Sequence, residues 1–143
     1  MNNTYIQKQI KQPAWYLIDA TSKNLGRLST FISVLLKGKN DIKYTLHVNP
    51  KINVIIINAK NINVTGQKKS QKIYKRHSGR PGKLKKESFE QLNKRIPNRI
   101  IENSIKGMLP KNSLGKQLFR QLHVYPGNEH PYIAQKPKII KFN

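Results

Sequence analysis

The residues that could do chemistry in this sequence gather in one basic stretch, residues 66–86. It contains nine lysines and arginines and no carboxylate: Lys68, Lys69, Lys72, Lys75, Arg76, Arg80, Lys83, Lys85 and Lys86. An ordinary solubilising surface mixes charges of both signs. A run of one sign therefore indicates a surface that meets a dense anion, of which a nucleic-acid backbone is the commonest. We expect this stretch to contact phosphate groups.

The whole chain has the same imbalance of charge. Its 143 residues include 28 Lys and Arg against 6 Asp and Glu, which gives a formal net charge of +22. Self-repulsion of this size destabilises a compact state, so we expect the protein to fold or act against a polyanion. An anionic membrane is the alternative to nucleic acid, but the chain shows neither a lipidation motif nor a long basic amphipathic helix.

Two rings and a pair of glycines lie within the basic stretch. Tyr74 and His77 offer flat rings on which unstacked bases of RNA could lie. Residues 79–82, Gly-Arg-Pro-Gly, match the Gly-x-x-Gly loop with which KH domains hold a nucleic-acid backbone. That loop joins two helices, whereas no helical pattern of apolar residues precedes residue 79 here. We interpret the segment as a bent, mobile loop that carries cations.

Residues suited to catalysis are few and scattered. Paired-carboxylate catalysis needs two acids in one cleft. The acids of the chain are Asp19, Asp41, Glu87, Glu90, Glu102 and Glu129. Cysteine is absent, and the four histidines show no metal-binding spacing. No nucleophile elbow and no phosphate-cradling glycine motif occurs. We expect no catalytic residue, no metal site, no cofactor and no small-molecule substrate.

The hydropathy of the chain bears on its compartment. The apolar run of residues 54–57 is far too short to cross a bilayer. The first dozen residues lack the apolar block of a signal peptide. The absence of cysteine excludes disulfides. We expect an intracellular protein with no membrane partner.

The elements that position the basic stretch follow from apolar periodicity. Residues 14–18 read as a strand, and the apolar spacing from Leu25 to Leu36 predicts a helix that begins after Asn24. Residues 53–58 have the β-branched centre of a strand buried on both faces, which is typical of a parallel sheet. Residues 62–65 alternate like a short added strand.

Beyond the basic stretch the pattern is helical. Ser88 and Gln91 have the spacing of a capping box and predict a short helix. Pro97 suits the first turn of another helix, interrupted by Gly107 and Pro110. Its apolar face comprises Ile101, Ile105, Met108 and Leu109. A third helical segment has an apolar side of Leu114, Leu118 and Leu122.

The end of the chain is punctuated by prolines. Residues 122–125 could make a final strand, after which an extended, basic tail follows. No internal repeat and no Gly- or Ser-rich linker divides the chain. We expect one α/β domain with basic loops. The expected parts are a polar N-terminal extension (residues 1–14), the domain (15–125) and the basic extended C-terminal tail (126–143).

Short motifs follow one another along the chain. They are WYLIDA (15–20), LGRLST (25–30), YTLH (44–47), INA (57–59), VTGQK (64–68), RHSGRPG (76–82), KGMLPK (106–111), LG (114–115) and VYPG (124–127). Each is a weak signal alone. In this order they closely resemble the bacterial-type ribosomal protein L13 family of the large subunit, over about residues 15–137.

The resemblance implies a fold and a role. The implied fold is a three-layer α/β/α arrangement around a small, mainly parallel four-stranded sheet. The implied role is non-enzymatic: the family binds large-subunit (23S-type) ribosomal RNA early in assembly and stays as a structural component beside neighbouring large-subunit proteins. Residues 106–111 would be a helix end, with Met108 and Leu109 packed inward.

The motif at residues 76–82 resembles the form in plastid and cyanobacterial members of the family. The heavy use of Lys, Ile and Asn also points to an AT-rich genome such as that of a plastid. We expect the protein on the ribosome of a plastid (chloroplast) stroma, with a bacterial cytoplasm as the alternative.

Contact with RNA is expected from the basic stretch and a few residues outside it. The candidate rRNA-binding residues are Lys68, Lys69, Tyr74, Arg76, His77, Arg80, Lys83, Lys85, Lys86, Lys111, Arg120 and Arg27. Phosphate contacts would supply affinity, and RNA shape would supply specificity. Two other functions stay open: a free RNA-binding regulator of translation, and an RNA-processing enzyme, for which the chain shows no clustered acid–base set.

Overall fold

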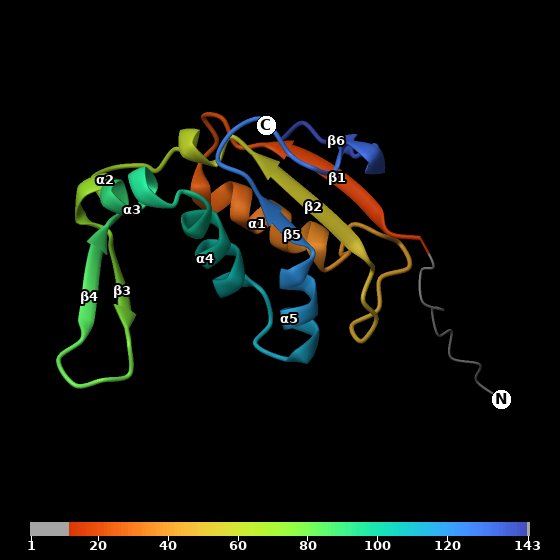
Figure 1. The fold of residues 1–143 in the computed structure, drawn as a ribbon. Coiled ribbons are helices and arrows are strands. Elements are labelled where there is room, and N and C mark those ends of the chain that lie inside the picture. The colour runs from red at the N-terminus through yellow and green to blue at the C-terminus, as the bar shows by residue number, and fades with distance from the viewer. Residues whose placement is uncertain (1–11, 143) are drawn as a thin grey trace.

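The computed structural model describes residues 12–142 (Figure 1). Most of the expected N-terminal extension therefore lies outside the described residues. The strands are β1 (Ala14–Asp19), β2 (Ile52–Ile57), β3 (Ile73–His77), β4 (Leu84–Ser88), β5 (Leu122–Val124) and β6 (Lys138–Ile139). The α-helices are α1 (Leu25–Leu36), α2 (Lys68–Gln71), α3 (Phe89–Arg95), α4 (Asn98–Met108) and α5 (Ser113–Arg120). Two 3₁₀ helices, η1 (Ala59–Asn61) and η2 (Ile133–Gln135), complete the described elements.

A four-stranded sheet with the order β5-β2-β1-β6 forms the centre of the molecule. All its neighbouring strands pair in parallel. The register places Leu17 beside Ile55 and Ile55 beside His123, so these three side chains share one face of the sheet. The expected α/β class with a small parallel sheet is confirmed.

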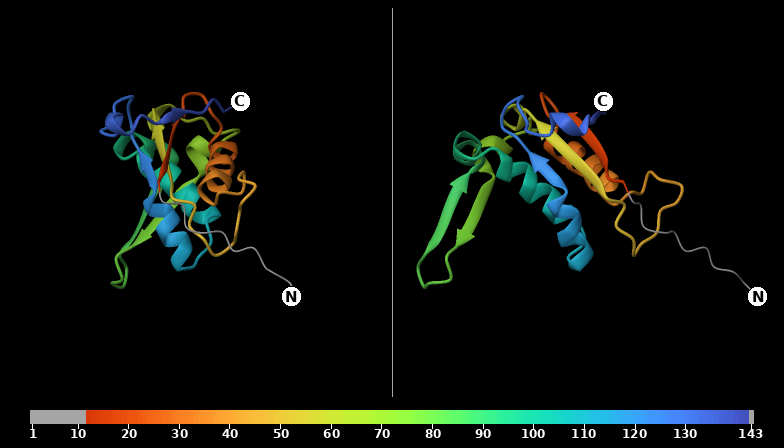
Figure 2. Two further views of the ribbon diagram at one scale, coloured as in Figure 1. Left: turned by 90° about the vertical axis from the view of Figure 1, so that its right-hand side faces the viewer. Right: turned by 45° about the vertical axis from the view of Figure 1, so that its right-hand side comes forward.

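Helices α1 and α4 pack on one face of this sheet and against each other (Figures 1 and 2). The chain moves from β1 to β2 and on to β5 in one direction across the sheet. Because parallel crossovers are right-handed, both connections pass over the same face. The buried core lies there, with Ile18, Val54, Ile56 and Val124 from the sheet, Leu28 and Ile32 from α1, and Ile101 and Ile105 from α4.

The C-terminal segment covers the opposite face of the sheet. From β5 the chain returns across the sheet to place β6 beside β1, so a right-handed connection passes over the other side. Tyr132 lies there, with its ring centroid 5.0 Å from that of Trp15 and 4.6 Å from that of His123. The sheet is thus covered on both sides, by helices on one and by the segment that contains η2 on the other.

Several local expectations are confirmed. Asn24 occupies the N-cap of α1, although its side chain makes no capping hydrogen bond. The capping box at the start of α3 is present: Gln91 N donates to Ser88 Oγ, and Ser88 N donates to Gln91 Oε1. Pro97 immediately precedes α4. The capping residues Asn24 and Ser88 and the proline at residue 97 therefore located these helix starts correctly.

The strand expected at residues 62–65 is wrong. Only an isolated parallel bridge joins Asn63 to Asn24. Asn24 is followed at once by α1, so its chain curls away and no ladder can continue. Ile62 and Val64 are buried all the same, and this burial accounts for their alternation in the sequence.

Two further differences concern the C-terminal half. Met108 was expected to pack inward but is 38% exposed, whereas Leu109 is buried. Helix α4 runs through Gly107 to Met108 and turns Met108 away from the core. The strand at residues 122–125 is present as β5, but it is not the last strand, because β6 follows it. Leu122 belongs to β5 and not to the helix before it.

Candidate nucleic-acid interface

The basic stretch begins with helix α2, and from residue 73 it forms a β-hairpin that projects from the body of the molecule (Figure 1). Strands β3 and β4 pair antiparallel from Ile73 opposite Ser88 to His77 opposite Leu84. Gly79 and Gly82 in the connecting loop have φ angles of 90° and 73°, a region that favours glycine. The bent segment expected at residues 79–82 is present as the loop of this hairpin, whereas the strands on either side of it, residues 73–77 and 84–88, were not predicted. The hairpin is a separate two-stranded sheet. Because neither of its faces is covered by another layer along its length, its sequence carries no apolar alternation.

Cations oppose one another directly across the hairpin. Lys75 pairs with Lys86, and the next pair along the strands is Arg76 with Lys85. Consecutive pairs point to opposite faces of a β-ribbon, so each face carries one pair of like charges. Like charges directly opposite are destabilising in an antiparallel pair. An anion bound to either face would relieve this repulsion.

The base of the hairpin is fixed to the body by three contacts. Phe89 N donates to Lys72 O at 2.9 Å. Tyr74 packs against the buried core cluster. The Nη2 atom of Arg95 on α3 lies 2.9 Å and 2.7 Å from the two carboxylate oxygens of Glu87 on β4. This is the single ion pair among the described residues. The positive charge of the hairpin is therefore almost uncompensated by its own chain.

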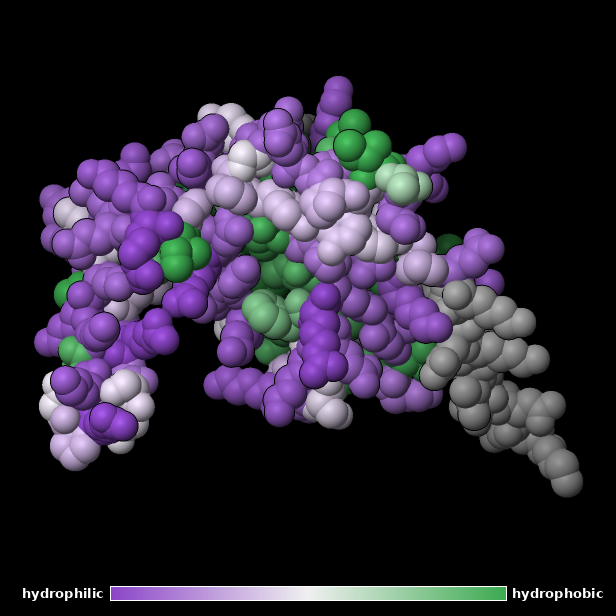
Figure 3. All heavy atoms as spheres, viewed as in Figure 1, coloured by the Kyte–Doolittle hydropathy of each residue, from purple (hydrophilic) through white to green (hydrophobic). Residues whose placement is uncertain are grey.

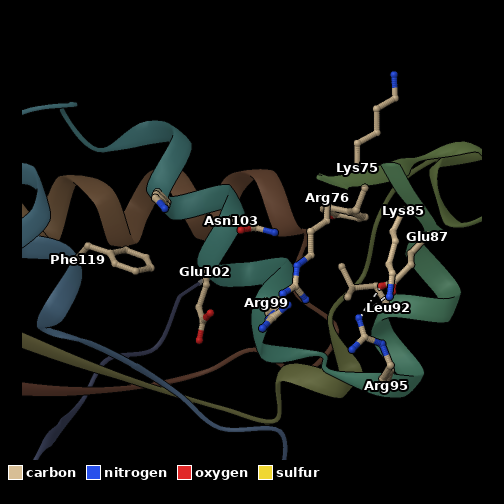
Figure 4. Close-up of a pocket in the computed structure, with 12 residues that line it drawn as sticks. Lys75, Arg76, Lys85, Glu87, Leu92, Arg95, Arg99, Glu102, Asn103 and Phe119 are labelled. Atoms are coloured by element: carbon tan, nitrogen blue, oxygen red, sulfur yellow. Dashed lines mark hydrogen bonds and ion pairs between the residues drawn. The ribbon is translucent and has the colours of Figure 1, made fainter. Parts of the chain in front are cut away.

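A groove of about 340 Å³ lies between the hairpin and the helices of the body (Figure 4). Residues of β3, β4, α3, α4 and α5 line it. Its cations include Arg76 and Lys85 of the hairpin, Arg95 and Arg99 near the α3–α4 turn, and Lys106 of α4. Its acids are Glu87 and Glu102. In the view of Figure 3 the hairpin surface is mostly hydrophilic.

Sequence reasoning missed Arg95 and Arg99 as members of this site. Each lies on a helix whose polar face looks like an ordinary solvated surface. A signal was present, because residues 99, 102, 103 and 106 are three and four apart and form one stripe on α4. All four line the groove. Only the folded position of the hairpin shows that this stripe forms a wall of the groove.

The structure places the remaining candidate residues in three groups. Arg80 and Lys83 lie in the exposed hairpin loop, while Lys86 lies on β4. Lys68 of α2 lines a surface depression with Arg27 at the start of α1, and Lys69 is exposed beside Lys68. Lys111 follows α4 and Arg120 ends α5, and both are exposed. The candidates thus do not form one cluster, but they lie on exposed surface.

The two rings proposed for base stacking have different surroundings. Tyr74 is half-buried, and burial raises the pKa of its hydroxyl above the usual value. The ammonium group of Lys72 lies 5.2 Å from the centroid of the Tyr74 ring. His77 is exposed, and its Nδ1 accepts a hydrogen bond of 3.0 Å from Gly79 N. His77 therefore has more ring surface available to a base than Tyr74 has.

Metal-binding clusters and membrane-spanning helices are two other features that the described residues could have contained. No group of three or more His, Cys, Asp or Glu in this part of the chain is arranged to hold a metal ion. No helix within residues 12–142 is long and apolar enough to span a membrane.

Comparison with known proteins shows which family the chain resembles. Residues 13–131 match the model of the family described as ribosomal protein L13. "Large ribosomal subunit protein uL13c" of Gracilaria tenuistipitata var. liui is 58% identical over 142 residues, 99% of this chain and 99% of that protein. "Large ribosomal subunit protein uL13" of Microchaete diplosiphon is 54% identical over 144 residues, covering 100% of this chain and 95% of the relative. The uL13c protein of Porphyra purpurea is 53% identical over 138 residues, 96% of this chain and 97% of that protein. The chain therefore belongs to the ribosomal protein L13 family.

Proposed function

We propose that this protein is a structural constituent of the large ribosomal subunit that binds large-subunit rRNA through its basic hairpin and the adjoining groove. The observation that carries the proposal is the uncompensated charge of the hairpin. Two cation pairs oppose one another across its strands, and a single ion pair lies at its base. The names of the relatives support the same subunit.

The proposed mechanism is electrostatic. Cationic side chains on the hairpin displace counterions that are condensed on the RNA, and the release of these ions favours binding. Contacts with α3 and with the core hold the base of the hairpin, so that RNA of the matching shape is preferred. Binding of this kind joins RNA segments during early assembly and needs no catalytic group. Ribosomal RNA and neighbouring large-subunit proteins are the proposed partners.

We place the protein in the ribosomes of a plastid, or of a bacterium in the alternative. The uL13c relatives and the cyanobacterial ones, which are 51% to 58% identical to this chain, support that assignment.

Sedimentation tests the proposal directly. A tagged copy of the full chain is expressed in cells, and lysates are separated on sucrose gradients before and after a high-salt wash. A structural constituent stays with the large subunit through the wash. Release of the protein into the top fractions by the wash would favour a free RNA-binding regulator. Metal-dependent cleavage of RNA by the purified protein would instead favour an enzyme.

A binding experiment complements the sedimentation test. The purified full chain is titrated with transcribed large-subunit rRNA and with small-subunit rRNA as a matched polyanion. Preference for large-subunit rRNA at physiological salt is the expected result. Equal affinity for the two RNAs would contradict specific assembly into the large subunit.

A further inference from the structure

The groove between the hairpin and α4 has two basic walls that face each other. Arg76 reaches into it from β3, and Arg99 reaches into it from α4 (Figure 4). Lys75, the neighbour of Arg76, points away from the groove in the same view. This alternation is what the pleat of β3 requires. The two arginines thus converge although they are far apart in sequence.

Neither of the convergent arginines forms an ion pair within residues 12–142, although Glu87 and Glu102 also line the groove. In the part of the chain that the structure describes, the carboxylate of Glu87 pairs with Arg95, and no other ion pair forms. Glu102 lies on α4 on the side toward Phe119 (Figure 4). Guanidinium groups that meet without a carboxylate repel each other, and the planar fork of arginine matches phosphate oxygens well. The groove therefore has the chemistry of a phosphate site.

The dimensions of the groove limit what can occupy it. Its volume of about 340 Å³ lies at the low end of sites for small ligands. It has room for a nucleotide-sized length of one strand. Phe119 lies in its wall, with the ammonium of Lys106 5.9 Å from the ring centroid. A strand in the groove would thus meet cations from the hairpin and from α4 together.

On the basis of the function proposed above, we infer that this groove clamps one strand of large-subunit rRNA, with Arg76 and Arg99 binding its backbone from opposite walls. The hairpin alone then does not make the site. The clamp requires α4, which carries Arg99 and Lys106. This differs from a basic hairpin that lies on the RNA surface, because the bound strand is held between two elements of the protein.

The first test compares variants of the full chain in binding to transcribed large-subunit rRNA. Arg76→Gln and Arg99→Gln each remove one charge-assisted contact, so each should weaken binding about tenfold or more. Because both residues act on one strand, the double variant should lose less than the product of the single losses. Lys43→Gln is the matched control, since Lys43 is an exposed cation in the loop after α1, far from the hairpin in Figure 1. Its affinity should stay within about twofold of the wild-type value.

The second test locates the RNA. The chain has no cysteine, so Asn103→Cys gives a single attachment point for an iron chelate that cleaves nearby RNA by hydroxyl radicals. Asn103 is exposed and lines the groove. Cleavage of one contiguous RNA segment from this position, reduced by Arg99→Gln, is the expected result. Lys43→Cys carries the same probe as a control and should give a different pattern.

The outcomes separate the two proposals. If the wild-type chain shows no preference for large-subunit rRNA, the proposed function fails. If it binds that RNA but Arg76→Gln and Arg99→Gln behave like Lys43→Gln, only the clamp is overturned. If the probe at residue 103 gives no RNA cleavage, or the same pattern as the probe at residue 43, the clamp is also overturned. Circular dichroism and the unfolding temperature of each variant exclude loss of folding as the cause.

Discussion

Gly115 in α5 lies so close to the backbone of Pro110 that no side chain fits between them. An ideal Cβ on Gly115 would be 1.8 Å from the carbonyl oxygen of Pro110 and 2.8 Å from its carbonyl carbon. The amide of Gly115 is also used, because it donates to Asn112 Oδ1 at 2.8 Å and so caps α5. Two of the motifs, residues 106–111 and 114–115, are therefore one structural unit in which α5 turns back on the end of α4.

Replacement of Gly115 by alanine should destabilise the protein. The atoms that a new Cβ would meet belong to the backbone, so relief requires a shift of the turn or of α5. We expect Gly115→Ala to lower the free energy of unfolding by about 2 kcal/mol, within the usual range for an overpacked site. Urea unfolding followed by circular dichroism measures this loss.

Gly107 provides the matched control for this substitution. It lies inside α4, and nothing is within 4 Å of the Cβ that alanine would add. Glycine inside a helix costs roughly 0.5 to 1 kcal/mol relative to alanine. Gly107→Ala should therefore stabilise the protein by up to about 1 kcal/mol. Equal destabilisation by both substitutions would mean that the contact with Pro110 is not the cause.

Lys37 connects the ends of two helices. Lys37 is the C-cap residue of α1, and its Nζ donates to Met108 O at 3.1 Å. Met108 ends α4, where carbonyl groups lack partners within the helix. We expect Lys37→Met to lower the free energy of unfolding by about 1 kcal/mol.

The adjacent lysine tests whether the hydrogen bond matters or only the charge. Lys39 is exposed, two residues further along. Lys39→Met should leave the urea midpoint nearly unchanged. If Lys39→Met costs as much as Lys37→Met, the loss comes from charge near α1 and not from the bond to Met108.

The sequence predicts the centre of the fold well because burial leaves a pattern there. The β-branched run of β2 is buried from Val54 to Ile57, and the apolar spacing of α1 matches its buried face. The hairpin leaves no such pattern, since its strands are held by each other and by contacts at their base. Strand β6 spans only Lys138–Ile139, and its position depends on how the C-terminal segment crosses the sheet. No local signal could have predicted it.

The candidate site, like the fold, has one part that the sequence predicts and one part that it does not. Excess charge is a property of composition, so the basic stretch is visible without a structure. The groove is a property of tertiary packing, because Arg99 becomes relevant only when Arg76 lies across from it. The exposed apolar tip of the loop after α1, which includes Ile42 and Leu46, was not predicted either. Exposure of such residues cannot be read from their types alone.

His123 should make stability depend on pH. Its ring stacks on Trp15 with a centroid distance of 5.8 Å, and its Nδ1 lies 3.3 Å from Tyr132 Oη. Burial lowers the pKa of His123 below its ordinary value of 6.5. In the window between these two pKa values the unfolded chain binds more protons than the folded one, so stability falls as the pH is lowered through it. Unfolding by urea at pH 7.5, 6.5 and 5.5 measures the effect.

One variant checks the assignment of this pH dependence. His123→Phe keeps a ring against Trp15 and removes the titrating group, so stability should fall less steeply below pH 6.5. An unchanged slope for His123→Phe would assign the effect to other groups.

The salt dependence of RNA binding tests the hairpin as a whole. Replacing four of its cations by alanine should weaken binding and flatten the plot of log affinity against log salt concentration. The four are Arg76, Arg80, Lys83 and Lys86. Each lost phosphate contact lowers the slope by roughly 0.7 to 0.9, so the slope should fall by about 3 if all four contact phosphate.

A second fourfold variant separates contact from net charge. It removes four exposed lysines outside the candidate site, Lys43, Lys60, Lys94 and Lys141, and so has the same net charge. Counterion release counts only charges that reach phosphates, so the control should keep most of the wild-type slope. Equal flattening in the two variants would mean that long-range attraction, and not contact by the hairpin, sets the affinity. If the slope for the hairpin variant falls by less than about 3, the size of the fall indicates how many of its four cations reach the RNA.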